Sequence, residues 1–216
     1  MELKEQIEKL FEMQDELNCL IDPDWKDRDF DWAFAALAEL MEIKEWLGWK
    51  WWKDTYKQGL TEENLKQVQI EVIDVLHFFL SWEIQQACNT CTFINIDEIV
   101  RYLSSSKYSG RSLTELVDTA IPYCSEYDEP NWFLFNQIRI AAKLSWEAVW
   151  KLYLGKYALN IFRQKHGYKE GTYIKNWDGQ EDNQVLEGLL NAMPDLKPEE
   201  VLALLETEYA KVANHV

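Results

Sequence analysis

The 216-residue sequence contains few of the residues that interrupt helices, with only 8 glycines and 5 prolines. Long uninterrupted helices are therefore expected. Apolar runs are also short, and none approaches the roughly 18 residues needed to cross a bilayer. No segment fits the G-x-x-x-x-G-K-[ST] pattern of a phosphate-binding P-loop. These absences disfavour a membrane-spanning protein and a P-loop nucleotide site.

Cysteine is scarce too, with 4 in the whole chain, which is too few for a disulfide-rich scaffold. Cys88 and Cys91 form a C-x-x-C pair, but no second pair or nearby histidine accompanies them, so chance spacing is expected rather than a zinc site. The first residues are charged and lack the apolar stretch of a signal peptide. We therefore expect a reduced, cytoplasmic protein.

Positive charge is in short supply. Lys and Arg number 22 against 38 Asp and Glu, which gives a net charge of −16. A uniformly acidic surface repels nucleic acid and anionic membranes, so we expect neither as a partner. The charge is unevenly distributed, however. Residues 156–175 hold five basic residues and one acidic residue, a net charge of +4, so the rest, at −16 minus +4, carries −20.

The spacing of apolar residues is helical along most of the chain. It predicts helices over 2–20, from about 30 towards 46, from Thr61 onwards, over 112–125, over 131–164 and over 198–212. Residues 104–111 and 167–179 are typical of loops. No alternating strand pattern of useful length is present. We predict an all-α protein, a single-domain helical bundle over residues 1–216 with a four-helix core.

Four acidic residues stand in two pairs at i, i+3 spacing, which places each pair on one helix face. They are Glu39 with Glu42 and Glu71 with Asp74. The second pair interrupts a helix that is apolar on almost every side, where unpaired carboxylates are costly. A divalent cation with oxygen ligands, such as Mg²⁺, removes that cost. A solvated helix face is the alternative, above all for the first pair.

The basic segment begins with Lys156, Asn160 and Arg163, which follow one another at helical spacing. A loop containing glycine, lysine and tyrosine comes next. Such a segment offers several hydrogen-bond donors to phosphate oxygens. The alternative is a basic helix end that complements the helix dipole, followed by a turn.

Four tryptophans lie within seven residues, at 46, 49, 51 and 52. They could form part of the core. Because four such side chains near a helix end cover several faces, we expect some of them to contact a partner subunit or a base.

These motifs, in this order, resemble those of the dimeric all-α dUTPases of trypanosomatids, Campylobacter and certain phages, within the all-α NTP pyrophosphohydrolase superfamily. The resemblance runs through nearly the whole chain. It is carried by Gln14-Asp-Glu-Leu-Asn18, Glu39-x-x-Glu42, Trp49-Lys-Trp-Trp-Lys53, Ile70-Glu-Val-Ile-Asp74-Val-Leu-His77-Phe, Lys156-x-x-x-Asn160-x-x-Arg163-Gln and Gly167-Tyr-Lys-Glu-Gly-Thr-Tyr-x-Lys175-x-Trp177. Residues 84–130 match least, and we expect this segment to be either more mobile or specific to this branch of the family.

The resemblance implies a homodimeric, Mg²⁺-dependent enzyme that hydrolyses dUTP, and possibly dUDP, and so limits uracil in DNA. In the family, attack is thought to fall on the β-phosphorus of dUTP and to give dUMP and pyrophosphate. Glu39, Glu42, Glu71 and Asp74 would hold two or three Mg²⁺ ions, with Glu39 also deprotonating the attacking water. Phosphate ligands would be Lys156, Arg163, Tyr168, Lys169 and Lys175. Gln14 and Asn18 would bind the uracil edge, and His77 and Asn160 would lie by the sugar or base.

Two other functions stay open at this point. A related pyrophosphohydrolase with another base preference, such as dCTP, would carry the same four carboxylates. A catalytically inactive acidic helical binding protein is the second alternative, although such a protein would gain nothing from this cluster of acids. The motif at Gln14 and Asn18 and the block from Lys156 to Lys175 favour dUTP.

Overall fold

The computed structural model describes residues 1–54, 60–193 and 197–213. The chain forms two compact units, which are described one at a time. The first consists of Met1–Asp15 and Lys26–Trp146, and the second of Glu16–Trp25 and Glu147–Val216. The prediction of one domain stays a prediction, because this division does not tell whether either unit folds without the other.

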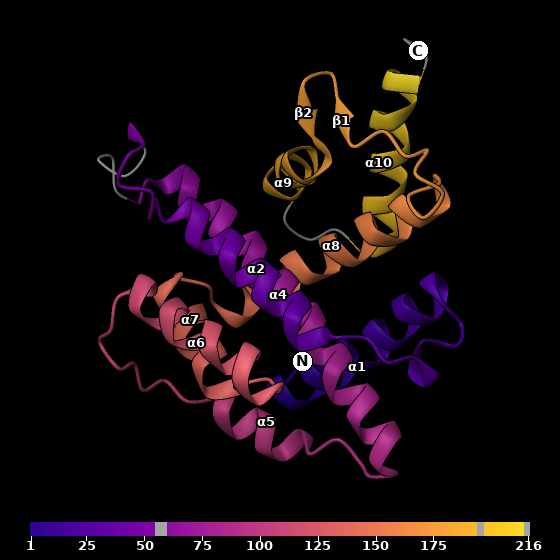
Figure 1. Cartoon of the computed structure of the whole chain (residues 1–216). Coiled ribbons are helices and arrows are strands. Elements are labelled where there is room, and N and C mark those ends of the chain that lie inside the picture. Colours follow the sequence, from indigo (N-terminus) through magenta and orange to yellow (C-terminus); the bar gives the residue numbers. More distant parts are fainter. Residues whose placement is uncertain (55–59, 194–196, 214–216) are drawn as a thin grey trace. The chain divides into compact units, whose positions relative to one another are not determined.

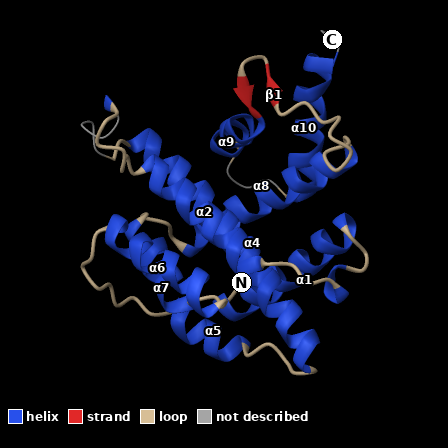
Figure 2. Cartoon of the chain, in the orientation of Figure 1, coloured by secondary structure: helices blue, strands red, loops and turns tan. Residues whose placement is uncertain are grey.

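Helices make up nearly all of the regular structure in the described residues, which confirms the all-α class (Figure 2). The elements are α1 (Leu3–Ile21), η1 (Trp25–Asp27), α2 (Trp32–Trp46), α4 (Glu62–Thr90), α5 (Ile96–Leu103), α6 (Leu113–Tyr127), α7 (Trp132–Ala141), α8 (Trp146–Lys165), β1 (Asn176–Trp177), β2 (Gln180–Glu181), α9 (Asp182–Ala192) and α10 (Pro198–Ala213). The two strands pair antiparallel and are two residues long.

The long helix α4 forms the centre of the first unit, and α2 packs alongside it (Figure 1). It begins where predicted, since the Thr61 side chain accepts a hydrogen bond of 3.1 Å from the Asn64 backbone N–H. Apolar residues on several of its faces are buried, among them Val68, Ile70 and Ile73. A helix that is apolar all round must be covered by others, and α2 and α7 both contact it.

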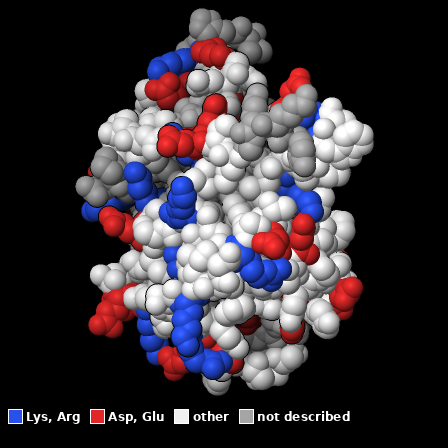
Figure 3. Space-filling model, turned by 90° about the vertical axis from the view of Figure 1, so that its left-hand side faces the viewer, with Lys and Arg blue, Asp and Glu red and all other residues white. Residues whose placement is uncertain are grey.

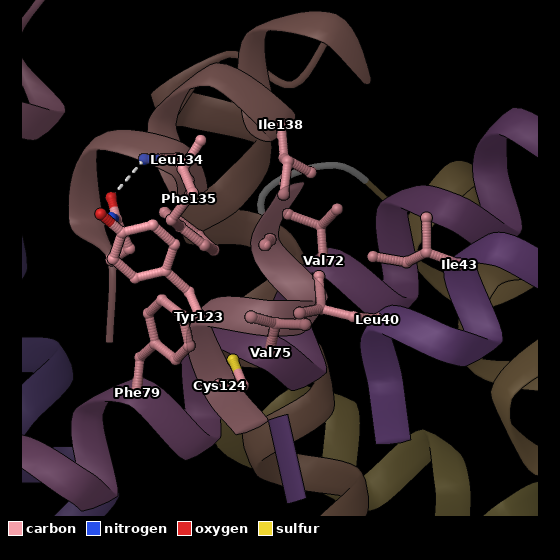
Figure 4. A pocket seen from close by; sticks show the side chains of 12 residues that line it. Leu40, Ile43, Val72, Val75, Phe79, Tyr123, Cys124, Leu134, Phe135 and Ile138 are labelled. Carbon is pink, nitrogen blue, oxygen red and sulfur yellow. Dashed lines mark hydrogen bonds between the residues drawn. The ribbon is translucent and has the colours of Figure 1, made fainter. Parts of the chain in front are cut away.

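An apolar pocket lies in the core of the first unit, between α2, α4, α6 and α7 (Figure 4). Leu40, Val75 and Phe135 line it, and so does the Cys124 thiol, whose pKa is raised to about 11 by burial. The Asn131 side chain at its edge accepts from the Leu134 backbone N–H and so caps α7. The pocket therefore belongs to helix packing and has almost no polar groups to offer a nucleotide.

The second unit has its own core, built from α8, α9, α10 and β1. Its buried residues include Phe162, Trp177, Leu190 and Leu205. Gly155 of α8 is required by this packing, because a Cβ there would lie 2.6 Å from Cδ1 of Leu190. The unit thus presses α9 closely against α8.

The prediction of a single helix over 131–164 is wrong, because a turn separates α7, which ends at Ala141, from α8, which begins at Trp146. Lys143 adopts a left-handed conformation with φ of 57°. The Leu144 N–H then donates to the Arg139 carbonyl at 3.0 Å, which closes α7 with a Schellman-type turn. The Arg139 guanidinium in turn donates to the Leu144 carbonyl. No glycine or proline marks this break in the sequence.

Two helices were not predicted, α5 and α9. Helix α6 begins close to the predicted start at 112, and the Ser112 side chain caps it. Together, α5 and α6 show that much of segment 84–130 is regular helix. Its greater mobility stays a prediction. Among the described residues, no helix combines the length and apolar character that crossing a membrane requires.

Candidate active site

Three carboxylates come together where α2 packs on α4. Glu39 and Glu42 lie one turn apart on α2, Glu71 lies on α4, and one ligand oxygen from each is within 4.8 Å of the others. Glu71 is only 7% exposed, Glu39 is partly buried and Glu42 is exposed. Three of the four predicted metal ligands are thus neighbours, although two different helices supply them.

Asp74, the fourth predicted ligand, lies one turn after Glu71 on α4 and is partly buried. The i, i+3 spacing places these two acids on the same face of the helix. The Trp46 indole N–H donates a hydrogen bond of 3.3 Å to Oε1 of Glu71. This bond orients one oxygen of the buried carboxylate.

Glu45, the next acid along α2, is engaged elsewhere. Its carboxylate lies 2.6 Å from the Lys50 ammonium and accepts a bond of 2.9 Å from the Trp49 indole N–H. The hydrogen bond from Lys50 lowers the pKa of Glu45. Glu45 is therefore tied to the segment that follows α2 and is not part of the group of three.

A group of close carboxylates with one buried member has limited chemical uses. Like charges at this distance repel each other unless a cation compensates them. Carboxylate oxygens are hard ligands that suit Mg²⁺, which normally keeps several waters and bridges to phosphates. The donor set of Glu39, Glu42 and Glu71 therefore fits a magnesium centre.

A buried polar network joins α1 to α4 in the first unit. Oε1 of Gln14 lies 2.6 Å from Nδ1 of His77, and Nε2 of Gln14 donates to the Ser81 hydroxyl at 3.0 Å. The Ser81 hydroxyl donates in turn to the His77 carbonyl at 2.9 Å. Two of the residues predicted to contact base or sugar, Gln14 and His77, thus lie side by side, and the network fixes the Gln14 amide.

Asn18, the other predicted uracil ligand, is on α1 one turn after Gln14 and is 5% exposed. It falls in the part of α1 that belongs to the second unit. The i, i+4 spacing places both amides on one face of α1.

The basic residues of α8 meet the first residues of α9 in the second unit. Arg163 donates to Asp182 through Nε and Nη2, both at 2.8 Å, and to Asn160 through Nη1 at 3.2 Å. The Lys156 ammonium donates to Oδ1 of Asn183 at 3.1 Å. The predicted phosphate ligands on α8 are therefore gathered in one cluster, and each is held by a defined partner.

The loop after α8 supplies the remaining basic residues. The Arg163 guanidinium lies 5.7 Å from the ring centroid of Tyr168. The Lys169 ammonium donates to the Ile21 carbonyl at 2.9 Å, and Lys175 forms an ion pair of 3.1 Å with Glu181. Tyr168 thus lies with Arg163, whereas Lys169 is directed to the end of α1 and Lys175 to the start of α9.

Comparison with known protein families matches residues 6–168 to the dUTPase family. This chain belongs to that family. It is accordingly an enzyme that hydrolyses dUTP, a dUTP diphosphatase. No curated protein matched the chain in a separate search.

The match to the dUTPase family covers most of the candidate site residues but stops short of two of them. Lys169 and Lys175 lie beyond residue 168, as do Asp182 and Asn183. Their contacts with α1, α8 and the rest of the second unit therefore come from this structure rather than from the family.

Sequence reasoning missed three residues that this dUTPase places against the predicted ones, namely Ser81, Asp182 and Asn183. The spacing of Ser81 could have identified it from the sequence, because it lies one turn after His77 on the helix that carries Glu71 and Asp74. Asp182 and Asn183 had none, since they contact residues 19 and 27 positions earlier.

One face of this dUTPase carries mixed charge rather than acidic side chains alone (Figure 3). On the face drawn in Figure 3, positive and negative side chains lie among one another, with wide uncharged areas between them. The net charge of −16 is therefore compatible with a triphosphate substrate.

Proposed function

We propose that this dUTPase requires Mg²⁺, held as two or three ions by Glu39, Glu42, Glu71 and Asp74, and that it releases dUMP and pyrophosphate. The observation that carries the proposal is the approach of three carboxylates within 4.8 Å of one another, one of them buried. Bound Mg²⁺ would supply Lewis-acid activation of the phosphates and of water. The same metal centre would also bind the phosphates of dUDP, a shorter substrate.

Glu39 is the residue we assign to the attacking water. It is partly buried, whereas Glu42 is exposed and Glu71 receives the Trp46 indole bond. A carboxylate that is partly shielded but still reachable by water can accept a proton as a general base. In the proposed reaction, water adds to the β-phosphorus of dUTP and passes one proton to Glu39. The bond from the β-phosphorus to the oxygen that bridges it to the α-phosphorus breaks, so that dUMP leaves and pyrophosphate remains.

Lys156, Arg163, Tyr168, Lys169 and Lys175 are proposed to bind phosphate oxygens. The support is the clustering of three of them in the second unit: the Arg163 guanidinium lies 5.7 Å from the Tyr168 ring centroid, and Lys156 and Arg163 both lie against Oδ1 of Asn183. Fixed cations at a transferring phosphoryl group stabilise the charge that develops there.

The uracil edge is proposed to pair with the amides of Gln14 and Asn18, with His77 and Asn160 beside the sugar or base. Gln14 and Asn18 are both nearly buried. A site that must satisfy buried amides rejects a base whose donors and acceptors do not match, because the amides would be left without partners.

A homodimer is proposed from the tryptophans that follow α2. Trp51 and Trp52 are 70% and 57% exposed, and their rings contact each other at 5.7 Å between centroids. These side chains are therefore not core. Large exposed aromatic area is typical of an interface.

All four cysteines are free thiols, which supports the proposed cytoplasmic setting.

Metal binding tests the proposal without relying on turnover. Mn²⁺, used as a paramagnetic substitute for Mg²⁺, should bind the wild type, and Glu71→Gln should weaken binding by about tenfold or more, because a ligand is lost. Glu45→Gln is the matched control on α2, and it should bind as the wild type does. Equal Mn²⁺ binding by all three proteins would show that these carboxylates do not form the metal site.

A further inference from the structure

The first turn of α9 is built around the basic side chains of α8. Asp182 is completely buried and accepts two hydrogen bonds from the Arg163 guanidinium, each 2.8 Å long. The Arg163 side chain is 11% exposed. Two parallel bonds between a planar guanidinium and a carboxylate fix the orientation of the guanidinium as well as its position.

The Asp182 carboxylate is itself held from the loop that precedes it. The Tyr173 hydroxyl donates to its Oδ2 at 2.7 Å, and its backbone N–H donates to the Lys175 carbonyl at 3.0 Å. Burial opposes ionisation of Asp182, but the bonds from Arg163 and Tyr173 outweigh it and lower the pKa of Asp182. Asp182 is thus a charged anchor that cannot easily move.

Asn183 holds the second cation of the cluster, the Lys156 ammonium. Its Oδ1 accepts from the Lys156 ammonium at 3.1 Å and lies 3.5 Å from Nη2 of Arg163. Lys156 is only 3% exposed. An amide oxygen accepts a hydrogen bond from a buried ammonium without adding a negative charge beside it.

Asp182 and Asn183 hold both cations in defined positions before any ligand is bound. One of these two partners is charged and the other is neutral, so the four side chains, taken by themselves, carry a net positive charge. Lysine and arginine lose considerable rotamer freedom when they are fixed. A protein that fixes them in advance spares that loss when a polyanion binds.

We propose that Asp182 and Asn183, at the start of α9, are positioning residues that hold Arg163 and Lys156 in the orientation in which they bind the phosphates of dUTP. The inference rests on the proposed function, in which Arg163 and Lys156 contact phosphate. It adds two residues that lie outside the part of the chain matched to the family. The competing role is purely structural, in which the ion pair only fastens α9 to α8.

A double-mutant cycle separates these two roles. The variants are Asp182→Asn, Arg163→Met and the double variant, with kcat, KM and the thermal midpoint measured for each. Asp178→Asn is the control, because Asp178 is exposed and its left-handed conformation suits asparagine equally well. We expect Asp182→Asn to lower kcat/KM for dUTP by about 10- to 100-fold through misplacement of Arg163, and Asp178→Asn to change nothing.

The double variant carries the decision. Removing both partners of a buried ion pair restores stability that removal of one partner loses, so its thermal midpoint should rise above that of Asp182→Asn. Its kcat/KM should stay at the level of Arg163→Met. A double variant whose kcat/KM falls below that of Arg163→Met by the full factor that Asp182→Asn loses on its own would show that Asp182 acts independently of Arg163, and it would overturn the inference.

Two further outcomes keep the inference apart from the proposed function. If Arg163→Met keeps wild-type kcat/KM, the assignment of Arg163 to phosphate fails, and the positioning role of Asp182 fails with it. If Arg163→Met is impaired but Asp182→Asn is not, only the inference fails. Should Asp182→Asn not fold, Asn183→Ala replaces it, because Asn183 is only partly buried. This variant should bind inorganic pyrophosphate about tenfold more weakly than the wild type. Unchanged binding of pyrophosphate would contradict the inference.

Discussion

Oε1 of Gln14 lies 2.6 Å from Nδ1 of His77, so a side chain of α1 and a side chain of α4 meet inside the first unit. Because the Gln14 amide also donates to Ser81, its oxygen must be the acceptor and His77 must carry a proton on Nδ1. The amide is therefore fixed in one of its two orientations, which is what recognition of a single base requires.

Ser81→Ala tests whether this fixed orientation matters. Ser81 is completely buried, so its removal leaves the Gln14 N–H group without its acceptor, at a cost of about 1–3 kcal/mol. We expect a lower free energy of unfolding in urea and a higher KM for dUTP, with a smaller change in kcat. A variant with the stability loss but an unchanged KM would contradict the role of Gln14 in base recognition.

Glu39→Gln tests the proposed general base. The amide keeps the size of the side chain but cannot accept a proton, so nucleotide binding should persist while kcat falls by about 100-fold or more. Calorimetric titration with dUTP and an assay of pyrophosphate release measure the two effects. Glu45→Gln, on the same helix but paired with Lys50 and Trp49, should keep most of its activity. A fully active Glu39→Gln variant would exclude Glu39 as the base.

Two glycines give a matched test of the packing in the second unit. A methyl group at Gly155 would lie 2.6 Å from Leu190, whereas one at Gly188 would meet nothing within 4 Å. Gly155→Ala should therefore destabilise the protein by about 1–3 kcal/mol despite its better helix propensity. Gly188→Ala should stabilise it by about 0.5–1 kcal/mol. Equal thermal shifts for the two variants would contradict the close approach of α9 to α8.

The ion pair of Arg163 and Asp182 also predicts a dependence of stability on pH. The pKa of Asp182 lies below its ordinary value of 3.8, so its contribution to stability is fully present above that value and is lost as pH falls towards the folded pKa. Between pH 5 and pH 3 the wild type should lose more of its free energy of unfolding than Asp182→Asn does. Parallel pH curves for the two proteins would show that Asp182 is not ionised in the folded state.

Local interactions explain which parts of the fold could be predicted. The start of α4 at Thr61 and of α6 at Ser112 depend on capping by the residue itself, so the sequence alone predicts them. The end of α7 depends on a lysine in a left-handed turn and on a carbonyl that the buried Arg139 caps, and neither has a marker in the sequence. Helix α9 was missed because its apolar residues are few and Gly188 interrupts them.

The same distinction holds for the site. Periodicity puts Glu39 with Glu42, but only helix packing brings Glu71 to them. The partner of Arg163 lies 19 residues further along the chain, across a loop and two short strands, so no spacing rule finds it. The sequence therefore predicts the charged residues of the candidate site, and the structure adds residues that contact them.

The most direct test of the central claim is the release of pyrophosphate from dUTP, dCTP, dTTP and UTP, each with and without Mg²⁺. We expect rapid release from dUTP, slow release from the other three and none once the metal is removed, with dUMP as the second product. Preferential release from dCTP would contradict the assigned base recognition. Release from dUTP that persists in the complete absence of divalent metal would contradict the magnesium centre at Glu39, Glu42, Glu71 and Asp74.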